Sequence, residues 1–211
     1  VRTNGVDRMF SEPEHQSIAE AIAAAERKTS GEIVVVVAAE SDTYLYVPLL
    51  WASALALLVP WPLIFFTWLP IQTIYLLQLA VFFVIALVLW TRPLRYLLVP
   101  ASVKQARAHR RAVEQFLAQN LHTTKGRTGV MIFVSVAEHF AEVLADVEIH
   151  DKVPKATWQG IVDRLIADIK ASRPADGFIS AVESAGRLLA EHFPPGKEDP
   201  DELPNHLIVL G

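Results

Sequence analysis

The chain has 211 residues, a formal net charge of −4, seven histidines and no cysteine. Because the histidines are scattered and have no cysteine partner, these counts argue against a cage for a transition metal. The hydrophobic share of 52% and the charged share of 20% suit a globular protein of one or two domains, but the apolar residues are unevenly distributed along the chain.

The most unusual segment runs from Thr43 to Thr91 and contains no charged side chain. A helix that spans a bilayer needs only about 20 apolar residues, and a core helix of a soluble protein rarely sustains more than about 14. As one straight helix the segment would extend on the order of 70 Å, far more than the roughly 30 Å of a hydrocarbon core. The sequence therefore predicts a transmembrane hairpin with two crossings, in contact with the lipid bilayer over residues 44–91.

Three prolines between residues 60 and 70 mark the turn of this hairpin, because proline interrupts regular helical hydrogen bonding. We expect the first helix at about Tyr44–Pro60 and the second at about Ile71–Trp90. In an alternative, the first helix continues through a proline kink to about Trp68. Both alternatives return the chain to the side from which it entered.

Basic residues decide the predicted orientation. Eight Lys or Arg residues and a single acid, Glu114, occur from Arg92 to Arg127, whereas the turn of the hairpin carries no charge. By the positive-inside rule both flanks stay in the cytoplasm, so we expect a multi-pass protein of the cell (inner) membrane with its domain on the cytoplasmic side. Residues 1–40 lack the pattern of a secretory signal, and the first apolar segment is expected to direct insertion.

The residues before the hairpin predict one helix and one strand. Ser11 stands three residues before Glu14, which is the spacing of a capping box, and apolar residues recur behind it at helical spacing. This helix is expected to stop near Gly31. Directly after it, Glu32–Ala39 is a β-branched apolar run, typical of a strand that is covered on both faces.

The residues after the hairpin predict a similar alternation. A helix is expected over Ala101–Leu121, followed by a fully buried strand at Gly129–Val136 and a half-covered partner strand at Ala141–Ile149. Two more helices are expected around Trp158–Ile169 and Phe178–Leu189, and the late run LIVL is a candidate edge strand. The apolar face of the helix after the hairpin is expected to consist of Val103, Ala106, Val113, Phe116, Leu117 and Leu121.

These elements make a single α/β layer only if both flanks lie on the same side of the membrane, which an even number of crossings provides. The hairpin is therefore predicted to be an insertion after the first strand of one domain. We divide the chain into residues 1–42, the hairpin 43–91, the remainder of the domain 92–195 and an acidic, proline-rich tail 196–211.

The order of these segments resembles the TPM domain family, over about residues 10–195 apart from the hairpin. The resemblance rests on four stretches: SGEIVVVVA, RTGVMIFVS with the β-hairpin that it begins, a helix with a Trp near its start, and DGFISAVESAGRLLAEHF. Such domains are known from thylakoid lumen and photosystem repair proteins and from bacterial envelope proteins. The resemblance implies a three-layer α/β/α sandwich, an acidic metal site that binds calcium in some members, and an acid phosphatase activity claimed for some.

The sequence departs from the family where that chemistry would lie. It has LADVEIHD where members usually carry VGYGLEG, and SEPE where they often carry an Asp ahead of the first helix. Acids remain nearby, and several carboxylates in one loop suit a hard cation such as calcium or another divalent ion. The candidate metal ligands are Asp146, Glu148, Asp151 and Asp176, the last of which matches the acidic position of the family before a glycine.

These acids also have structural interpretations. Asp146 and Glu148 alternate with apolar residues and would face water from a half-covered strand, and Asp176 would cap the last helix. The sequence leaves the catalytic residues, if any, unknown, and it predicts no cofactor-binding site. The turn TTKGRTG lacks the spacing of a nucleotide loop, and no serine lies in a nucleophile-elbow motif.

The basic stretch after the hairpin is expected to contact anionic lipid headgroups, at about 1 kcal/mol for each cation near the surface. Tyr96 and Phe116 are the only Phe, Tyr or Trp residues in this stretch and are not interleaved with the cations as a nucleic-acid surface would require, so nucleic acid is not an expected partner. The residues expected to make the headgroup contact are Arg92, Arg95, Arg107, Arg110 and Arg111.

Two classes of function remain open. The first is a non-catalytic interaction or envelope-maintenance module at the membrane surface, which presents the domain to a membrane-protein partner. The second is a divalent-metal-dependent phosphatase that uses the acids between Asp146 and Asp176. The absence of a nucleophile and of a phosphate loop in the sequence favours the first, and the uncharged hairpin argues against transport.

Overall fold

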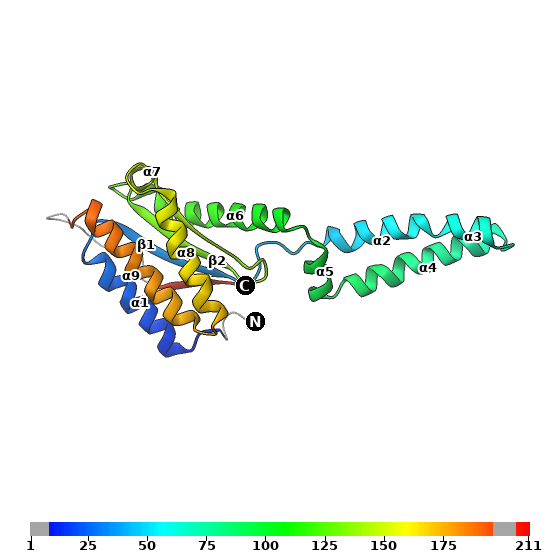
Figure 1. Ribbon diagram of the computed structural model, residues 1–211, viewed down its shortest axis with the longest axis horizontal. Coiled ribbons are helices and arrows are strands. Elements are labelled where there is room, and N and C mark those ends of the chain that lie inside the picture. The colour runs from blue at the N-terminus through cyan, green and yellow to red at the C-terminus, as the bar shows by residue number, and fades with distance from the viewer. Residues whose placement is uncertain (1–8, 196–205) are drawn as a thin grey trace. The chain divides into compact units, whose positions relative to one another are not determined.

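A computed structural model describes residues 9–195 and 206–211, without the side chains of Arg92 and Pro93 (Figure 1). The chain forms two compact units, which we describe separately. The first consists of residues 1–41 and 105–211, and the second of residues 42–104. The second unit therefore continues beyond the hairpin boundary predicted at Thr91. Most of the predicted tail, residues 196–205, lies outside the described residues.

The first unit is built on a mixed sheet with the strand order β3-β2-β1-β4. β1 is parallel to β2 and to β4, and β3 is antiparallel to β2. Every residue of β1 and β2 is buried, as predicted for strands covered on both faces, whereas β3 is half-buried throughout. The strands are β1 (Glu32–Ala38), β2 (Gly129–Ser135), β3 (Phe140–Ala145) and β4 (Leu207–Leu210), the last formed by the run LIVL.

Three helices cover one face of this sheet: α1 (Glu12–Glu26), α8 (Lys155–Lys170) and α9 (Pro174–His192). Figure 1 shows α9 between the other two, and it contacts both. α1 begins with the predicted capping box, because the carboxylate of Glu14 accepts hydrogen bonds from the backbone N–H and the hydroxyl of Ser11, at 2.6 and 2.7 Å. The helix ends at Glu26, earlier than the predicted stop near Gly31.

The other face of the sheet is covered by residues from α6 (Ala101–Ala118) and the short 3₁₀ helix η1 (Leu121–Thr123). The predicted apolar face of α6 is partly wrong. Val113 and Leu117 are 38% and 50% exposed, whereas Ala108 and Ala112 are fully buried. The small alanine side chains allow close packing of the helix, which turns the larger apolar residues toward solvent.

The strand predicted at Ala141–Ile149 is shorter in the structure. β3 ends at Ala145, and Asp146 then caps the short helix α7 (Val147–His150) by accepting a hydrogen bond from the N–H of Val147 at 2.7 Å. The alternation of apolar residues continues past Ala145, but an aspartate that caps a helix ends the strand.

The second unit contains α2 (Tyr46–Leu58), α3 (Pro60–Phe66), α4 (Ile71–Leu89) and α5 (Arg92–Leu98). α2 packs against α4. The segments Tyr46–Phe66 and Ile71–Leu89 are each long and apolar enough to cross a membrane, judged by length and composition. Helical structure resumes directly at Pro60, which agrees with the kinked alternative for the first segment rather than with an end at the proline.

Aromatic residues join the two ends of this unit. Tyr44 precedes α2 and is fully buried, and its ring meets that of Tyr96 in α5 edge to face. Val47 and Val99 complete the buried cluster. The chain is thus held together where it enters and leaves the apolar helices.

Candidate functional site

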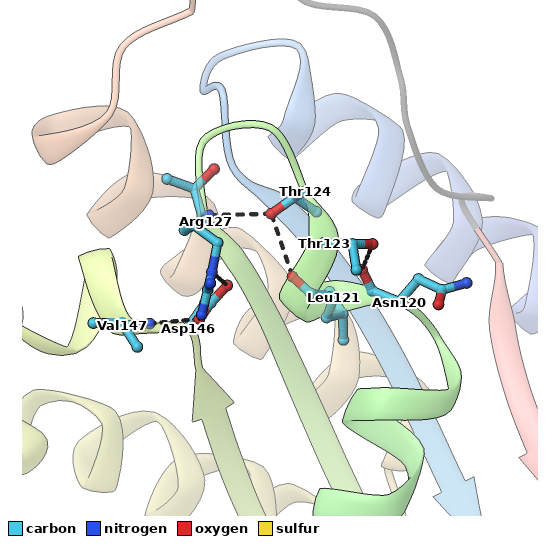
Figure 2. Close-up of polar contacts among 8 residues, drawn as sticks. Asn120, Leu121, Thr123, Thr124, Arg127, Asp146 and Val147 are labelled. Atoms are coloured by element: carbon cyan, nitrogen blue, oxygen red, sulfur yellow. Dashed lines mark hydrogen bonds and ion pairs between the residues drawn. The ribbon is translucent and has the colours of Figure 1, made fainter.

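An ion pair between Arg127 and Asp146 lies at the end of the sheet where β2 begins and β3 ends. Figure 2 shows the guanidinium against the carboxylate, with Nε donating to Oδ2 at 2.7 Å and Nη2 donating to Oδ1 at 2.9 Å. The side chain of Asp146 is 4% exposed and that of Arg127 is 52% exposed. The pair is therefore a bidentate contact with one buried partner, the geometry in which arginine binds a carboxylate best.

Local backbone geometry positions both side chains. Arg127 has a φ of 53°, in the left-handed region, and its N–H donates to the carbonyl of Thr124 at 3.0 Å. Arg127 lies in this tight turn (Figure 2), and only Thr128 separates it from the start of β2. The N–H of Asp146 donates to the carbonyl of Gly129 at 2.9 Å, which extends the pairing of β3 with β2. The sheet therefore positions the carboxylate of Asp146, and the turn places the guanidinium of Arg127 against it.

The environment changes the pKa of both partners. Burial by itself would raise the pKa of Asp146, but hydrogen bonds from Arg127 and from the N–H of Val147, together with the positive charge of Arg127, leave it below its ordinary value. The hydrogen bond and the charge of Asp146 raise the pKa of Arg127. Both groups are therefore ionised across the physiological range, and the pair stays closed.

The structure places the four predicted metal ligands differently. Asp146 is bound to Arg127, while Glu148 and Asp151 are exposed in α7 and just after it. Asp176 is exposed in the first turn of α9, whose N-cap is Arg173, so its predicted capping role is wrong. In the described ranges, no group of three or more His, Cys, Asp or Glu side chains is placed to hold a metal ion. The metal site remains a prediction, and a cation would compete with Arg127 for Asp146.

A second polar cluster, which the sequence did not reveal as a unit, lies where β1 and β2 end. Glu138 is 7% exposed and accepts hydrogen bonds from the N–H of Ser41, at 3.1 and 3.2 Å, and from the hydroxyl of Ser135. The hydroxyls of Ser41 and Ser135 are 2.7 Å apart. The carboxyl ends of parallel strands are the usual binding edge of an open α/β sheet, which was the signal available beforehand.

The cluster of Glu138, Ser41 and Ser135 ties the exit of β1 to the turn between β2 and β3. The hydroxyl of each serine is engaged, and Ser135 is fully buried. A buried serine whose hydroxyl donates to a carboxylate has the composition of half a catalytic dyad, but here the hydroxyl is held by Glu138 and Ser41 and is not free to act as a nucleophile. Its contribution is to the architecture of this edge.

The predicted headgroup residues differ in exposure. Arg107 and Arg110 are exposed, and Arg110 and Arg111 lie 3.0 and 3.6 Å from the carboxylate of Glu114. Arg95 is only 6% exposed, and its guanidinium lies 5.8 Å from the ring centroid of Tyr96, so it does not present a free charge as predicted. The side chain of Arg92 lies outside the described residues.

Comparison of the sequence with family models and with curated proteins gives no match. Among solved structures, the chain is similar to the NMR structure of the BA42 protein from the psychrophilic bacterium Bizionia argentinensis, with a TM-score of 0.60 and 22% sequence identity. The alignment covers 95% of this chain and 94% of that chain. At this identity the similarity establishes a shared fold, and the chain is accordingly an α/β protein with a mixed sheet.

Proposed function

We propose that this protein is an integral membrane protein whose TPM-like, three-layer α/β/α domain is held at the cytoplasmic face of the bacterial inner membrane by a transmembrane hairpin. In this proposal the domain is a non-catalytic interaction or envelope-maintenance module that presents its surface to a membrane-protein partner. The observation that carries the proposal is the pair of apolar segments, Tyr46–Phe66 and Ile71–Leu89.

The exposure of these segments supports insertion into lipid. Only 11% and 6% of their most apolar stretches are buried within the protein, and large side chains such as Phe66 and Leu87 are 86% and 75% exposed. Exposed apolar area of this size is unfavourable in water by roughly 25 cal/mol per Å². The segments are 21 and 19 residues long, which at about 1.5 Å per residue matches a hydrocarbon core of roughly 30 Å.

The distribution of charge supports the cytoplasmic orientation. The described hairpin turn, Thr67–Pro70, carries no charge, whereas exposed Arg107 and Arg110 follow the second segment. Loops rich in Lys and Arg remain on the cytoplasmic side, and such cations also favour contact with anionic headgroups. We therefore propose that α6 faces the membrane surface with these two arginines.

Insertion is tested by expressing the full chain and a variant in which residues 43–91 are replaced by a short flexible linker. The full chain is expected to stay with the membrane after extraction with alkaline carbonate, and the linker variant is expected to be released. Release of the full chain by carbonate would contradict the proposal. A soluble, folded linker variant would in addition show that the two flanks form one domain.

Orientation is tested with single cysteines, which the cysteine-free chain allows. Glu183 is an exposed residue of α9, and Leu69 lies in the hairpin turn, so Leu69→Cys is the matched control for Glu183→Cys. In cells whose outer membrane alone has been opened, an impermeant thiol reagent is expected to label Leu69→Cys. The same reagent is expected to label Glu183→Cys only after the inner membrane is also permeabilised. The reverse pattern would place the domain outside the cytoplasm.

The phosphatase alternative predicts a different result. Purified full chain with a divalent cation should then hydrolyse a phosphoester, and Asp146→Asn should abolish that activity. We expect no hydrolysis above the level of this variant, because the carboxylate of Asp146 is bound to Arg127.

Interaction through the domain surface is tested by crosslinking from Glu183→Cys in the membrane, where a discrete adduct with another membrane protein is expected.

A further inference from the structure

A cavity of about 510 Å³ opens between the turn that joins β2 to β3 and the last turns of α8. It is separate from the Arg127–Asp146 pair, which lies at the opposite end of β2. Its volume is within the range of about 300–1,000 Å³ that small-molecule sites occupy. The residues that line it are Val134, Ser135, Val136, His139, Phe140, Ala141, Ile166, Ile169 and Lys170.

The lining changes from apolar and buried to polar and exposed, with the cation of Lys170 at the exposed end. Val134 and Ser135 are buried and form the inner part of the cavity, whereas His139 and Lys170 are exposed and belong to its rim. The hydroxyl of Ser135 is already engaged by Glu138, so it leaves the inner part effectively apolar. A ligand that fits this gradient has an apolar body and an anionic end.

The charges near the rim agree with an anionic end. No acid lines the cavity, and in the described part of the chain Lys170 has no ion-pair or hydrogen-bond partner. The nearest acid along α8, Asp168, is bound to Arg173 at 2.7 Å. Lys170 lies at the C-terminal end of α8, where the negative end of the helix dipole already offsets part of its charge. Its pairing with a carboxylate is therefore expected to contribute less to the binding free energy than burial of the apolar body of the ligand.

We propose that this cavity binds a single-chain fatty acid, with the acyl chain along Val136, Ile166 and Ile169 and the carboxylate beside Lys170 and His139. The site goes beyond the proposed function, because it assigns the domain a ligand and does not depend on which side of the membrane the domain faces. A cavity of about 510 Å³ suits one acyl chain better than the two chains of a bilayer phospholipid. A membrane-attached protein has free fatty acids available in the surrounding lipid.

The test uses the full chain in phosphatidylcholine nanodiscs and palmitic acid that carries a photoreactive diazirine near its methyl end. After irradiation, the modified peptides are identified by mass spectrometry. We expect adducts on peptides that contain residues 134–141 or 166–170, competed several-fold more strongly by palmitate than by the alcohol of the same chain length. Adducts confined to residues 46–89, where the hairpin meets lipid, would overturn the proposal.

Matched variants separate the cavity from the bilayer. Ile169→Trp fills the cavity and is expected to remove the domain adducts, whereas Ile179→Trp changes another partly buried isoleucine on the same apolar core and should leave them. Ala141→Leu fills the cavity from the strand side and provides a second variant if Ile169→Trp does not fold. Persistence of the domain adducts in a folded cavity-filling variant would overturn the proposal.

The rim charge has its own matched pair. Lys170→Gln is expected to lower the yield of domain adducts with palmitate by a few-fold, and to remove the preference for palmitate over the alcohol. Lys155→Gln, an exposed lysine at the other end of α8, should change neither. Equal competition by acid and alcohol in the unmodified protein would contradict the assignment of the carboxylate to this rim.

Discussion

The ring of Tyr96 meets the ring of Tyr44 edge to face, with centroids 5.3 Å apart and planes at 77°. The hydroxyl of Tyr96 donates to the carbonyl of Asp42 at 3.2 Å, and Lys104 donates to the carbonyl of Tyr96 at 3.3 Å. These contacts link the residues before α2 to α5, which follows α4. They close the hairpin at the end where the chain enters α2 and leaves α4.

Tyr96→Phe tests this closure. The substitution keeps the ring contact and removes the hydrogen bond to Asp42, so we expect the free energy of unfolding to fall by about 1 kcal/mol. Tyr96→Ala should cost more, because it also exposes Tyr44 and removes the aromatic pair. Thermal unfolding in detergent micelles measures both. Faster cleavage by a protease between residues 42 and 46 in the alanine variant would locate the loss at the base of the hairpin.

Asp146→Asn should remove a pH-dependent part of the stability. The folded-state pKa of Asp146 lies below its ordinary value, so the folded protein binds fewer protons than the unfolded chain in acid. This stabilisation is complete above about pH 4 and is lost as the pH falls through the folded-state pKa. Because the Arg127 side chain is half-exposed, we expect a cost of about 1–2 kcal/mol at pH 7.

Urea unfolding of the two proteins at pH 7 and at about pH 3 checks this prediction. The difference between wild type and Asp146→Asn should shrink at the lower pH, because the unfolded wild-type chain is then largely protonated at position 146, whereas the lowered pKa of the folded protein opposes that protonation. A constant difference would mean that packing at position 146, rather than its charge, is responsible. Asparagine retains the capping of α7, so the helix itself is conserved in the comparison.

Two glycines in neighbouring helices should respond to alanine in opposite directions. A Cβ on Gly186 would lie 2.6 Å from the Cβ of Ala25, so Gly186→Ala forces α1 and α9 apart and is expected to cost about 1–3 kcal/mol. A Cβ on Gly160 meets nothing within 4 Å. Gly160→Ala in α8 should therefore stabilise the protein by about 0.5–1 kcal/mol through its better helix propensity. Thermal melts of both variants give the two signs.

Glu138→Ala should destabilise the edge where β1 and β2 end. It leaves the N–H of Ser41 and the hydroxyl of Ser135 without their carboxylate acceptor in a buried site, at an expected cost of about 1–3 kcal/mol. Glu138→Gln keeps one acceptor oxygen and should cost less. Hydrogen exchange distinguishes this mechanism from a general loss of packing. A local effect lowers the protection of the amides around Ser41 alone, whereas a general loss of packing lowers protection throughout the domain.

Much of the fold follows from local sequence patterns. An uncharged run from Thr43 to Thr91 is longer than any single span, and so it predicts a hairpin without knowledge of neighbours. The β-branched runs that form β1 and β2 predict strands covered on both faces, because exposing apolar side chains on either face to water is unfavourable. The capping box of Ser11 and Glu14 is likewise encoded within one helical turn.

Contacts between distant segments decided the rest. Which face of α6 is buried depends on whether small or large residues pack against the sheet. In the structure Ala108 and Ala112 are buried, whereas Val113 and Leu117 are exposed. The ion pair of Asp146 depends on Arg127, which lies nineteen positions earlier in the chain and reaches the carboxylate only because β2 and β3 pair. Patterns of apolar residues specify which elements form, but a polar side chain acquires its partner only when the sheet has assembled, because a hydrogen bond requires atoms within about 3 Å.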